Sequence, residues 1–234
     1  MTGCHIFSKG GAEMPTDTFF NLPQEKQQRI LEAAQKEFSR AALNEASIAN
    51  VVKDAGIARG SFYQYFENKE DLYYYYFHTV RKDSHRYLVQ AIQESQGNVF
   101  DGIELFFVHL IPEIFSGEHA LFYKNLFTSM DYHGFKRVAP TIEKREQPRI
   151  YGKETDHHKE HQALLDVIDE SKLKITSRHE LNMLLQMLMH IGFNSVTEGY
   201  RYEVNGQFDI DQAVANFRCK LAWLKNGAGK EIDK

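Results

Sequence analysis

The sequence predicts an all-α protein in which a small three-helix head precedes a larger helical body. Apolar residues recur every three or four positions along most of the 234 residues, and this spacing places them on one face of a helix. No segment alternates apolar and polar residues for long enough to predict a sheet, and no internal repeat is present. The hydrophobic content of 42% and the charged content of 26% are typical of a soluble globular protein.

Three short helices are expected in the head. The first spans residues 24–38 after Pro23, which suits a first helical turn. The second begins after Ser47, a residue type that caps helix N-termini, and the third covers residues 58–65. Gly56 separates them at a sharp turn that glycine adopts at low cost. Two short helices around such a turn are typical of a helix-turn-helix, which places its second helix in the DNA major groove.

The body is predicted to consist of longer helices. Asn68 is expected to cap a continuous helix over residues 68–95, with Asp71 completing a capping box. Pro112 is expected to kink the next helix because it removes a backbone hydrogen bond. Glycine, prolines and many charges predict a loop or short irregular helices over residues 131–155. The other predicted helices cover residues 99–115, 120–129, 157–170, 178–203 and 209–226.

Two segments of the chain resemble a known family. Residues 29–38, RILEAAQKEF, and residues 48–72, IANVVKDAGIARGSFYQYFENKEDL, are similar to the N-terminal signature of TetR/AcrR-type transcriptional regulators. The resemblance implies a helix-turn-helix DNA-binding domain over residues 19–67. It also implies a body, over residues 68–234, that binds a small-molecule effector and forms a homodimer through its last two helices. Residues 1–18 are expected to be a disordered extension or a segment foreign to the native chain.

The predicted reading helix carries side chains suited to DNA. Arginine can donate two hydrogen bonds to guanine and glutamine can pair with adenine, so Arg59, Ser61 and Gln64 are candidate base readers. Tyrosine and lysine can contact phosphates, and glycine lets the backbone approach DNA closely. Any surface helix exposes such residues, so the prediction depends on their combined spacing. The predicted DNA-contact residues are Ser47, Arg59, Gly60, Ser61, Tyr63, Gln64, Tyr65 and Lys69, whereas Phe62 and Phe66 are expected in the core.

Large and adaptable side chains are dense in the predicted body. Residues 73–77 are consecutive aromatics and therefore surround their helix, so some of them must face outward or into a cavity. Aromatic and methionine side chains can enclose an apolar effector, but they fill an ordinary core equally well. The candidate pocket residues are Tyr74, Phe77, His78, His85, Phe106, Phe122, Met183, Met187 and His190.

Histidines suggest two alternative ligands. His157 and His161 stand one helical turn apart, a spacing that can bind zinc or nickel, although a solvated polar face explains them as well. Histidines beside aromatic rings could ligate haem iron, and some regulators with a similar GSFYQYF segment sense haem. The haem candidates are His78, His85, His109, His133 and His190. No cofactor is required for the predicted function, and a haem- or metal-responsive regulator is the alternative.

The remaining composition narrows the class of protein. The net charge of −4 argues against a basic nucleic-acid coat but allows a small DNA-reading head. Two distant cysteines form no disulfide framework, which fits a reducing cytoplasm, and no apolar run is long enough for a membrane span or a secretory signal. No catalytic motif is present, so an enzyme is not expected. Together with the family resemblance, the composition predicts a cytoplasmic repressor that an effector releases from a palindromic operator. A helical partner-binding protein without DNA-binding activity is the alternative function.

Overall fold

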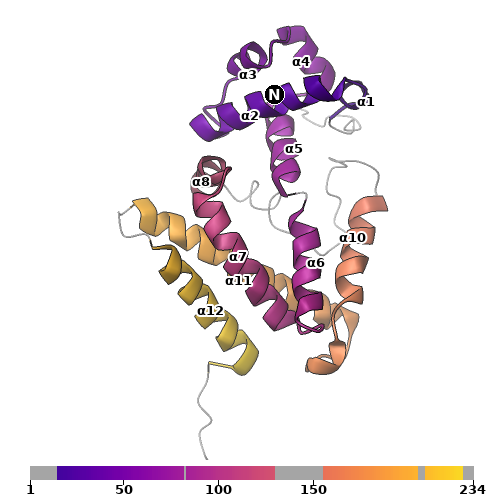
Figure 1. The fold of residues 1–234 in the computed structure, drawn as a ribbon, viewed down its shortest axis with the longest axis vertical. Helices are drawn as coiled ribbons and strands as arrows, with labels where there is room; N and C mark the ends of the chain where they lie inside the picture. The colour runs from indigo at the N-terminus through magenta and orange to yellow at the C-terminus, as the bar shows by residue number, and fades with distance from the viewer. Residues whose placement is uncertain (1–14, 82, 130–154, 205–208, 229–234) are drawn as a thin grey trace, which may run out of the picture.

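The protein is helical throughout the part of the chain that the structure describes. The computed structural model describes residues 15–81, 83–129, 155–204 and 209–228. No strand occurs in these ranges (Figure 1), so the all-α prediction is confirmed. The helices are α1 (Asp17–Phe20), α2 (Gln24–Arg40), α3 (Ile48–Asp54), α4 (Arg59–Tyr65), α5 (Lys69–Arg81), α6 (Ser84–Glu94), α7 (Val99–Ser116), α8 (Ala120–Ser129), α10 (Thr155–Asp166), the 3-10 helix η1 (Glu170–Lys172), α11 (Arg178–Val204) and α12 (Ile210–Asn226).

The helices α1 to α4 gather at one end of the molecule, and α5 leads from them into the body (Figure 1). Apolar side chains of α2, α3 and α4 form the core of this head, where Ile30, Phe38 and Val51 are at most 2% exposed. These positions lie on the faces that the three- and four-residue spacing predicts. Phe62 and Phe66 are fully buried, which confirms their predicted place in the core.

The head includes a helix that the sequence interpretation assigned to an extension. On α1, Phe19 is fully buried among aromatic rings of the head. Thr16 joins this segment to the end of α4, because its N–H donates to the carbonyl of Tyr65 (3.0 Å) and its hydroxyl to the carbonyl of Gln64 (2.6 Å). The predicted boundary at residue 18 is therefore wrong. These contacts make residues 15–18 part of the head, and the residues before them lie outside the described part of the chain.

The continuous helix predicted over residues 68–95 is two helices. α5 ends at Arg81 and α6 begins at Ser84, with Asp83 in the N-cap position of α6. Aspartate and the serine that follows it are weak helix formers that favour helix starts. The helical spacing of apolar residues continues on both sides of Asp83, so this spacing alone does not separate the two helices. At the beginning of α5 the predicted cap is confirmed, since Asn68 Oδ1 accepts a hydrogen bond from the N–H of Asp71 (2.9 Å).

The body is built around α7, which packs against α6, α8, α11 and α12. Two glycines permit close approaches between these helices. A Cβ on Gly102 of α7 would lie 2.5 Å from the side chain of Ile92 on α6, and a Cβ on Gly192 of α11 would lie 2.1 Å from the ring of Phe107 on α7. Any larger residue at either position would push the helices apart.

The later helix boundaries follow the sequence with one difference. The helices predicted over residues 99–115, 120–129, 178–203 and 209–226 are confirmed by α7, α8, α11 and α12. α10 ends at Asp166 instead of residue 170. The chain leaves the helix there because Ile168 enters the core and the N–H of Asp169 donates to the carbonyl of Gly97 (3.0 Å).

Two further predictions on the body remain open. Pro112 lies inside α7, and the kink that it should cause stays a prediction. The irregular segment predicted over residues 131–155 falls outside the described ranges except for its last residue. Among the helices that the structure describes, none combines the length and the apolar character needed to cross a membrane.

Candidate DNA-binding head

The turn between α3 and α4 has the geometry of a Schellman motif. Gly56 adopts a left-handed backbone conformation with φ of +65°. Its N–H donates to the carbonyl of Lys53 (3.2 Å), and the N–H of Ile57 donates to the carbonyl of Val52 (3.0 Å). These two bonds satisfy the last carbonyls of α3 and redirect the chain into α4. The predicted sharp turn at Gly56 is therefore confirmed.

One face of α4 is exposed and the other is buried. Arg59, Gly60, Tyr63 and Gln64 are exposed, and Ser61 is half-buried. The buried rings on the opposite face fix the rotation of the helix, so Arg59, Gly60, Tyr63 and Gln64 face outward together. The exposed face carries arginine and glutamine donors that suit base edges, and α4 contains no carboxylate.

Two of the predicted phosphate contacts are used inside the protein. Tyr65 is 3% exposed, and its ring packs edge-on against that of Phe19, with the ring centroids 6.2 Å apart. Lys69 Nζ donates to the carbonyls of Asn44 (2.8 Å) and Ala46 (3.2 Å), in the loop between α2 and α3. The prediction is corrected for Tyr65, which belongs to the core of the head. Lys69 fastens the loop to the start of α5, and its contact with a phosphate stays a prediction.

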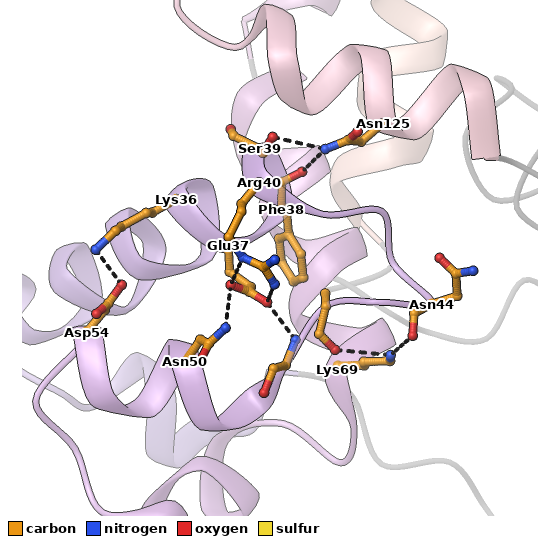
Figure 2. A network of polar contacts seen from close by, with 12 residues as sticks. Lys36, Glu37, Phe38, Ser39, Arg40, Asn44, Asn50, Asp54, Lys69 and Asn125 are labelled. Atoms are coloured by element: carbon orange, nitrogen blue, oxygen red, sulfur yellow. Dashed lines mark hydrogen bonds and ion pairs between the residues drawn. The ribbon is translucent and has the colours of Figure 1, made fainter.

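A buried carboxylate fixes the start of α3 (Figure 2). Glu37 of α2 is 4% exposed and accepts hydrogen bonds from Arg40 Nε (3.0 Å) and Nη2 (2.6 Å), from the N–H of Ser47 (2.7 Å) and from Asn50 Nδ2 (3.0 Å). The guanidinium of Arg40, followed by the other donors, lowers the pKa of Glu37 to about 2 from its ordinary 4.5. Ser47 holds the N-cap position, but its side chain makes no capping bond. The predicted side-chain cap is therefore wrong, and the contact that Glu37 makes at this end of α3 is with the backbone N–H of Ser47 itself.

The second half of α2 is joined to α8 of the body and to α3 of the head (Figure 2). Asn125 of α8 donates from Nδ2 to the carbonyls of Phe38 (2.9 Å) and Ser39 (3.0 Å), which end α2. Lys36 of α2 forms an ion pair with Asp54 of α3 at 2.8 Å. α3 is thus attached to α2, the loop before α3 is attached to α5 through Lys69, and α2 is attached to α8 through Asn125.

The charge on the reading surface favours an anionic partner. Between α3 and the end of α4 the ionised side chains are Lys53, Asp54 and Arg59. The ion pair with Lys36 compensates the charge of Asp54. The cations Lys53 and Arg59 are both exposed, so this small surface carries a positive excess although the whole chain is acidic.

Sequence reasoning missed Glu37, Asn125 and Thr16 as residues that hold the head. Polar side chains on amphipathic helices resemble solvated surface residues, and their hydrogen-bond partners lie far away in the sequence. One signal was present for Glu37. It occupies a position of the buried stripe of α2, between Ala34 and Phe38, where the periodicity calls for an apolar side chain.

Four of the candidate pocket residues lie in a filled core. Tyr74, Phe77, Phe106 and Phe122 are buried. The ring of Phe122 has its centroid 4.9 Å from that of Tyr76, and several neighbouring rings pack around it at similar distances. The neighbouring Tyr123 is buried as well, and this burial raises the pKa of its hydroxyl to about 12. The arrangement favours the filled-core alternative for these rings.

The other candidate pocket residues lie nearer the surface. Met183 and Met187 are 49% and 48% exposed, and His190 is also exposed. They project from the side of α11 opposite its buried leucines, so they are corrected from the interior to the surface of this chain. His78 and His85 are half-buried. A cleft of about 320 Å³ between α11 and α12 contains none of the predicted pocket residues; it is lined by Ser195, Glu198, Gly199, Tyr202, Asp209, Gln212, Ala213 and Asn216.

The histidine predictions stay open. His157 and His161 both lie on α10, but the side chain of His157 is outside the described residues. Among the side chains that the structure describes, no group of three or more His, Cys, Asp or Glu residues could hold a metal ion. Of the further haem candidates, His109 is exposed and His133 lies outside the described ranges.

Comparison with protein families matches both parts of the chain. Residues 30–77 match the family described as "Bacterial regulatory proteins, tetR family". Residues 98–228, more than half of the chain, match the "Tetracyclin repressor-like, C-terminal domain". The first match covers the helix-turn-helix and most of α5, and the second covers the body from α7 to α12.

Curated relatives match the head alone. Two proteins of Bacillus subtilis (strain 168), named as the uncharacterized HTH-type transcriptional regulators YdgC and YvdT, are 41% identical over 49 residues and 47% identical over 47 residues. These segments cover 21% and 20% of this chain and 25% and 24% of the two relatives. The chain therefore spans about a quarter of the length of the curated relatives that it matches.

Solved structures share the whole architecture. A TetR transcriptional regulator from Rhodococcus sp. RHA1 superposes with a TM-score of 0.50, covering 88% of this chain and 98% of its own. The transcriptional regulator FadR from Bacillus subtilis, in complex with stearoyl-CoA, superposes with a TM-score of 0.56, covering 86% and 99%. Both are 17% identical to this chain, so the likeness is one of fold.

Proposed function

The chain belongs to the TetR family of bacterial regulatory proteins, and on that premise we propose that it is a sequence-specific DNA-binding transcriptional regulator. We propose further that it is a repressor and that a small-molecule effector releases it from a palindromic operator. The observation that carries the proposal is the exposed face of α4. Its rotation is fixed by a buried aromatic face, and it presents Arg59, Gly60, Tyr63 and Gln64 beside a glycine turn.

The roles of these residues follow from their chemistry. Arg59 and Gln64 would donate to base edges in the major groove, Tyr63 would contact a phosphate, and Gly60 would allow the backbone to approach DNA. A homodimer through α11 and α12 would present two such helices to half-sites about one DNA turn apart, roughly 34 Å. The operator would then be a palindrome that matches the two-fold symmetry of the protein.

The test is selection of bound duplexes from random DNA by the wild-type protein, followed by titration of the selected duplex. Arg59→Ala is expected to weaken binding by about 1–3 kcal/mol and to relax the preference at one base pair of each half-site. Arg86→Ala, an exposed arginine on α6 of the body, is the matched control and is expected to bind as the wild type does. Selection that yields no preferred sequence would overturn the proposal.

The effector is proposed to act in the body. FadR, which shares the fold, was crystallised with stearoyl-CoA, so long-chain acyl-CoAs are the first compounds to test here. Haemin is the second, because His78 and His85 are half-buried in an aromatic body. An effector must bind the DNA-incompetent form more tightly, since only such a difference in affinity can release the operator. Release of the selected duplex on addition of the compound is the expected result, and binding without release would contradict its role as effector.

A further inference from the structure

We propose that Glu37 is a positioning residue for DNA recognition, whose buried carboxylate sets the placement of α3, and with it α4, on the rest of the molecule. This inference rests on the proposed DNA-binding function. Glu37 lies on α2 and faces the protein interior, so it does not touch DNA itself. It acts through the residues that it binds.

The carboxylate holds the N-terminal end of α3 by two independent contacts. One is the backbone N–H of Ser47, the N-cap residue, at 2.7 Å. The other is Nδ2 of Asn50, in the first turn of the helix, at 3.0 Å. The first N–H groups of a helix need acceptors, and the side chain of Ser47 provides none here. A carboxylate also interacts favourably with the positive end of the helix dipole.

The geometry requires a charged acceptor at this position. Both oxygens of Glu37 are used, because Arg40 donates from Nε to one and from Nη2 to the other. A neutral glutamine would place an NH₂ group against one set of these donors, so it could satisfy only about half of them. Either Ser47, whose N–H binds Oε1, or Asn50, whose Nδ2 binds Oε2, would then lose its acceptor while the surrounding apolar core stayed in place.

The turn of α2 that carries Glu37 is itself fixed to the body. The two carbonyls that follow it in sequence, those of Phe38 and Ser39, accept from Asn125 of α8 (Figure 2). The loop that follows is held by Lys69 of α5. Glu37 therefore connects the start of α3 to α2, and the end of α2 is connected in turn to α8 of the body.

The test compares Glu37→Gln with Glu32→Gln in the full-length protein. Glu32 is a matched control, because it undergoes the same substitution on the same helix but is exposed, and its side chain accepts from Gln28 one turn earlier on α2 (3.2 Å). The probe is the duplex selected by the wild-type protein, together with a scrambled duplex of the same length. Binding is measured well below the unfolding temperature, and stoichiometric titration gives the active fraction of each variant.

Glu37→Gln is expected to lower the ratio of operator affinity to scrambled-duplex affinity about ten-fold per active molecule, because misplacement of α4 affects base contacts more than general attraction to phosphates. Glu32→Gln is expected to keep the ratio within about two-fold of the wild type, as an exposed substitution away from the reading surface. A residue that served only folding would lower the active fraction and leave the ratio unchanged, and that result overturns the inference.

A conservative variant keeps the test decisive if Glu37→Gln does not fold. Glu37→Asp retains the charge but shortens the reach by one methylene, and it is expected to lower the ratio about three-fold. An unchanged ratio in Glu37→Asp, when the glutamine variant is unfolded, also overturns the inference. A wild-type protein that prefers no sequence would instead overturn the proposed function, so the two failures are distinguishable.

Discussion

Replacement of Gly60 by alanine would separate the stability of the head from its contact with DNA. Gly60 is the second residue of α4, it is exposed, and a Cβ there would have no heavy atom within 4 Å. Alanine is favoured over glycine in a helix by about 0.5–1 kcal/mol. In a chain of this size such a gain raises the unfolding temperature by about 1–4 °C. The variant is therefore expected to be at least as stable as the wild type.

DNA binding by Gly60→Ala is expected to change in the opposite direction. A backbone that approaches a phosphate or a base at van der Waals distance leaves no space for a methyl group, and forced overpacking costs about 1–3 kcal/mol. The dissociation constant for the operator should therefore rise about 5- to 150-fold. The free protein tolerates the methyl group, so the loss would arise only in the complex.

Thermal unfolding and fluorescence anisotropy with a labelled operator measure the two effects on the same sample. Ser129→Ala, at an exposed position at the end of α8, is a control of similar size on the body and should change neither quantity by much. A Gly60→Ala variant that binds as tightly as the wild type would refute the close approach of α4 to DNA. A large fall in its unfolding temperature would refute the open surroundings on which the argument depends.

Three further changes test other parts of the structure. Because the pKa of Glu37 is depressed, its ionised carboxylate contributes about 3 kcal/mol to the free energy of unfolding above pH 4.5, and this contribution is lost as the pH falls towards 2. Urea unfolding between pH 3 and 5 should therefore show a steeper fall of the free energy of unfolding in the wild type than in Glu37→Gln. Parallel plots of this free energy against pH for the two proteins would contradict the prediction. Phe19→Ala should lower the free energy of unfolding by about 3–5 kcal/mol, and Phe20→Ala, at a neighbour that is 47% exposed, by less than about 2 kcal/mol; equal losses by chemical denaturation would mean that α1 is not part of the head core. Trp223 is the single tryptophan and is 56% exposed in one chain. Dimerisation through α12 should therefore shift its fluorescence emission to shorter wavelength. An emission maximum that stays constant on dilution, while sedimentation shows that the dimer dissociates, would place the dimer contact elsewhere.

The head could be predicted closely because its signals are local. The turn at Gly56, the periodic apolar residues of α2 and the buried pair Phe62 and Phe66 all depend on neighbours within a few positions. The errors concern orientation. Tyr65 follows Phe62 by three residues and is therefore on its buried face, a consequence of helix geometry that a role inferred from the sequence motif does not include.

The body illustrates the opposite case. Periodicity predicted α11 and α12 nearly to the residue, but the same apolar residues can face a core, a cavity or a second subunit. Met187 and Phe122 were indistinguishable as candidate pocket residues, yet one is half exposed and the other fully buried. The difference depends on which helix packs on which face, and those contacts join residues far apart in the sequence. The same holds for Asn125, whose partners on α2 precede it by more than 80 residues.

The double attachment of the head limits how an effector in the body could move it. α5 follows α4 and is a separate helix from α6, so a displacement of α6 is not passed to α5 along one continuous helix. α8 contacts the head independently, through Asn125 and the carbonyls of α2. A shift of α5 alone would strain the bonds of Lys69 to the α2–α3 loop, whereas a joint shift of α5 and α8 would preserve both attachments. Because each of these hydrogen bonds involves a charged donor or a pair of carbonyls, preserving them is energetically favoured. Movement of the head together with α5 and α8 therefore costs less than movement of the head relative to these two helices.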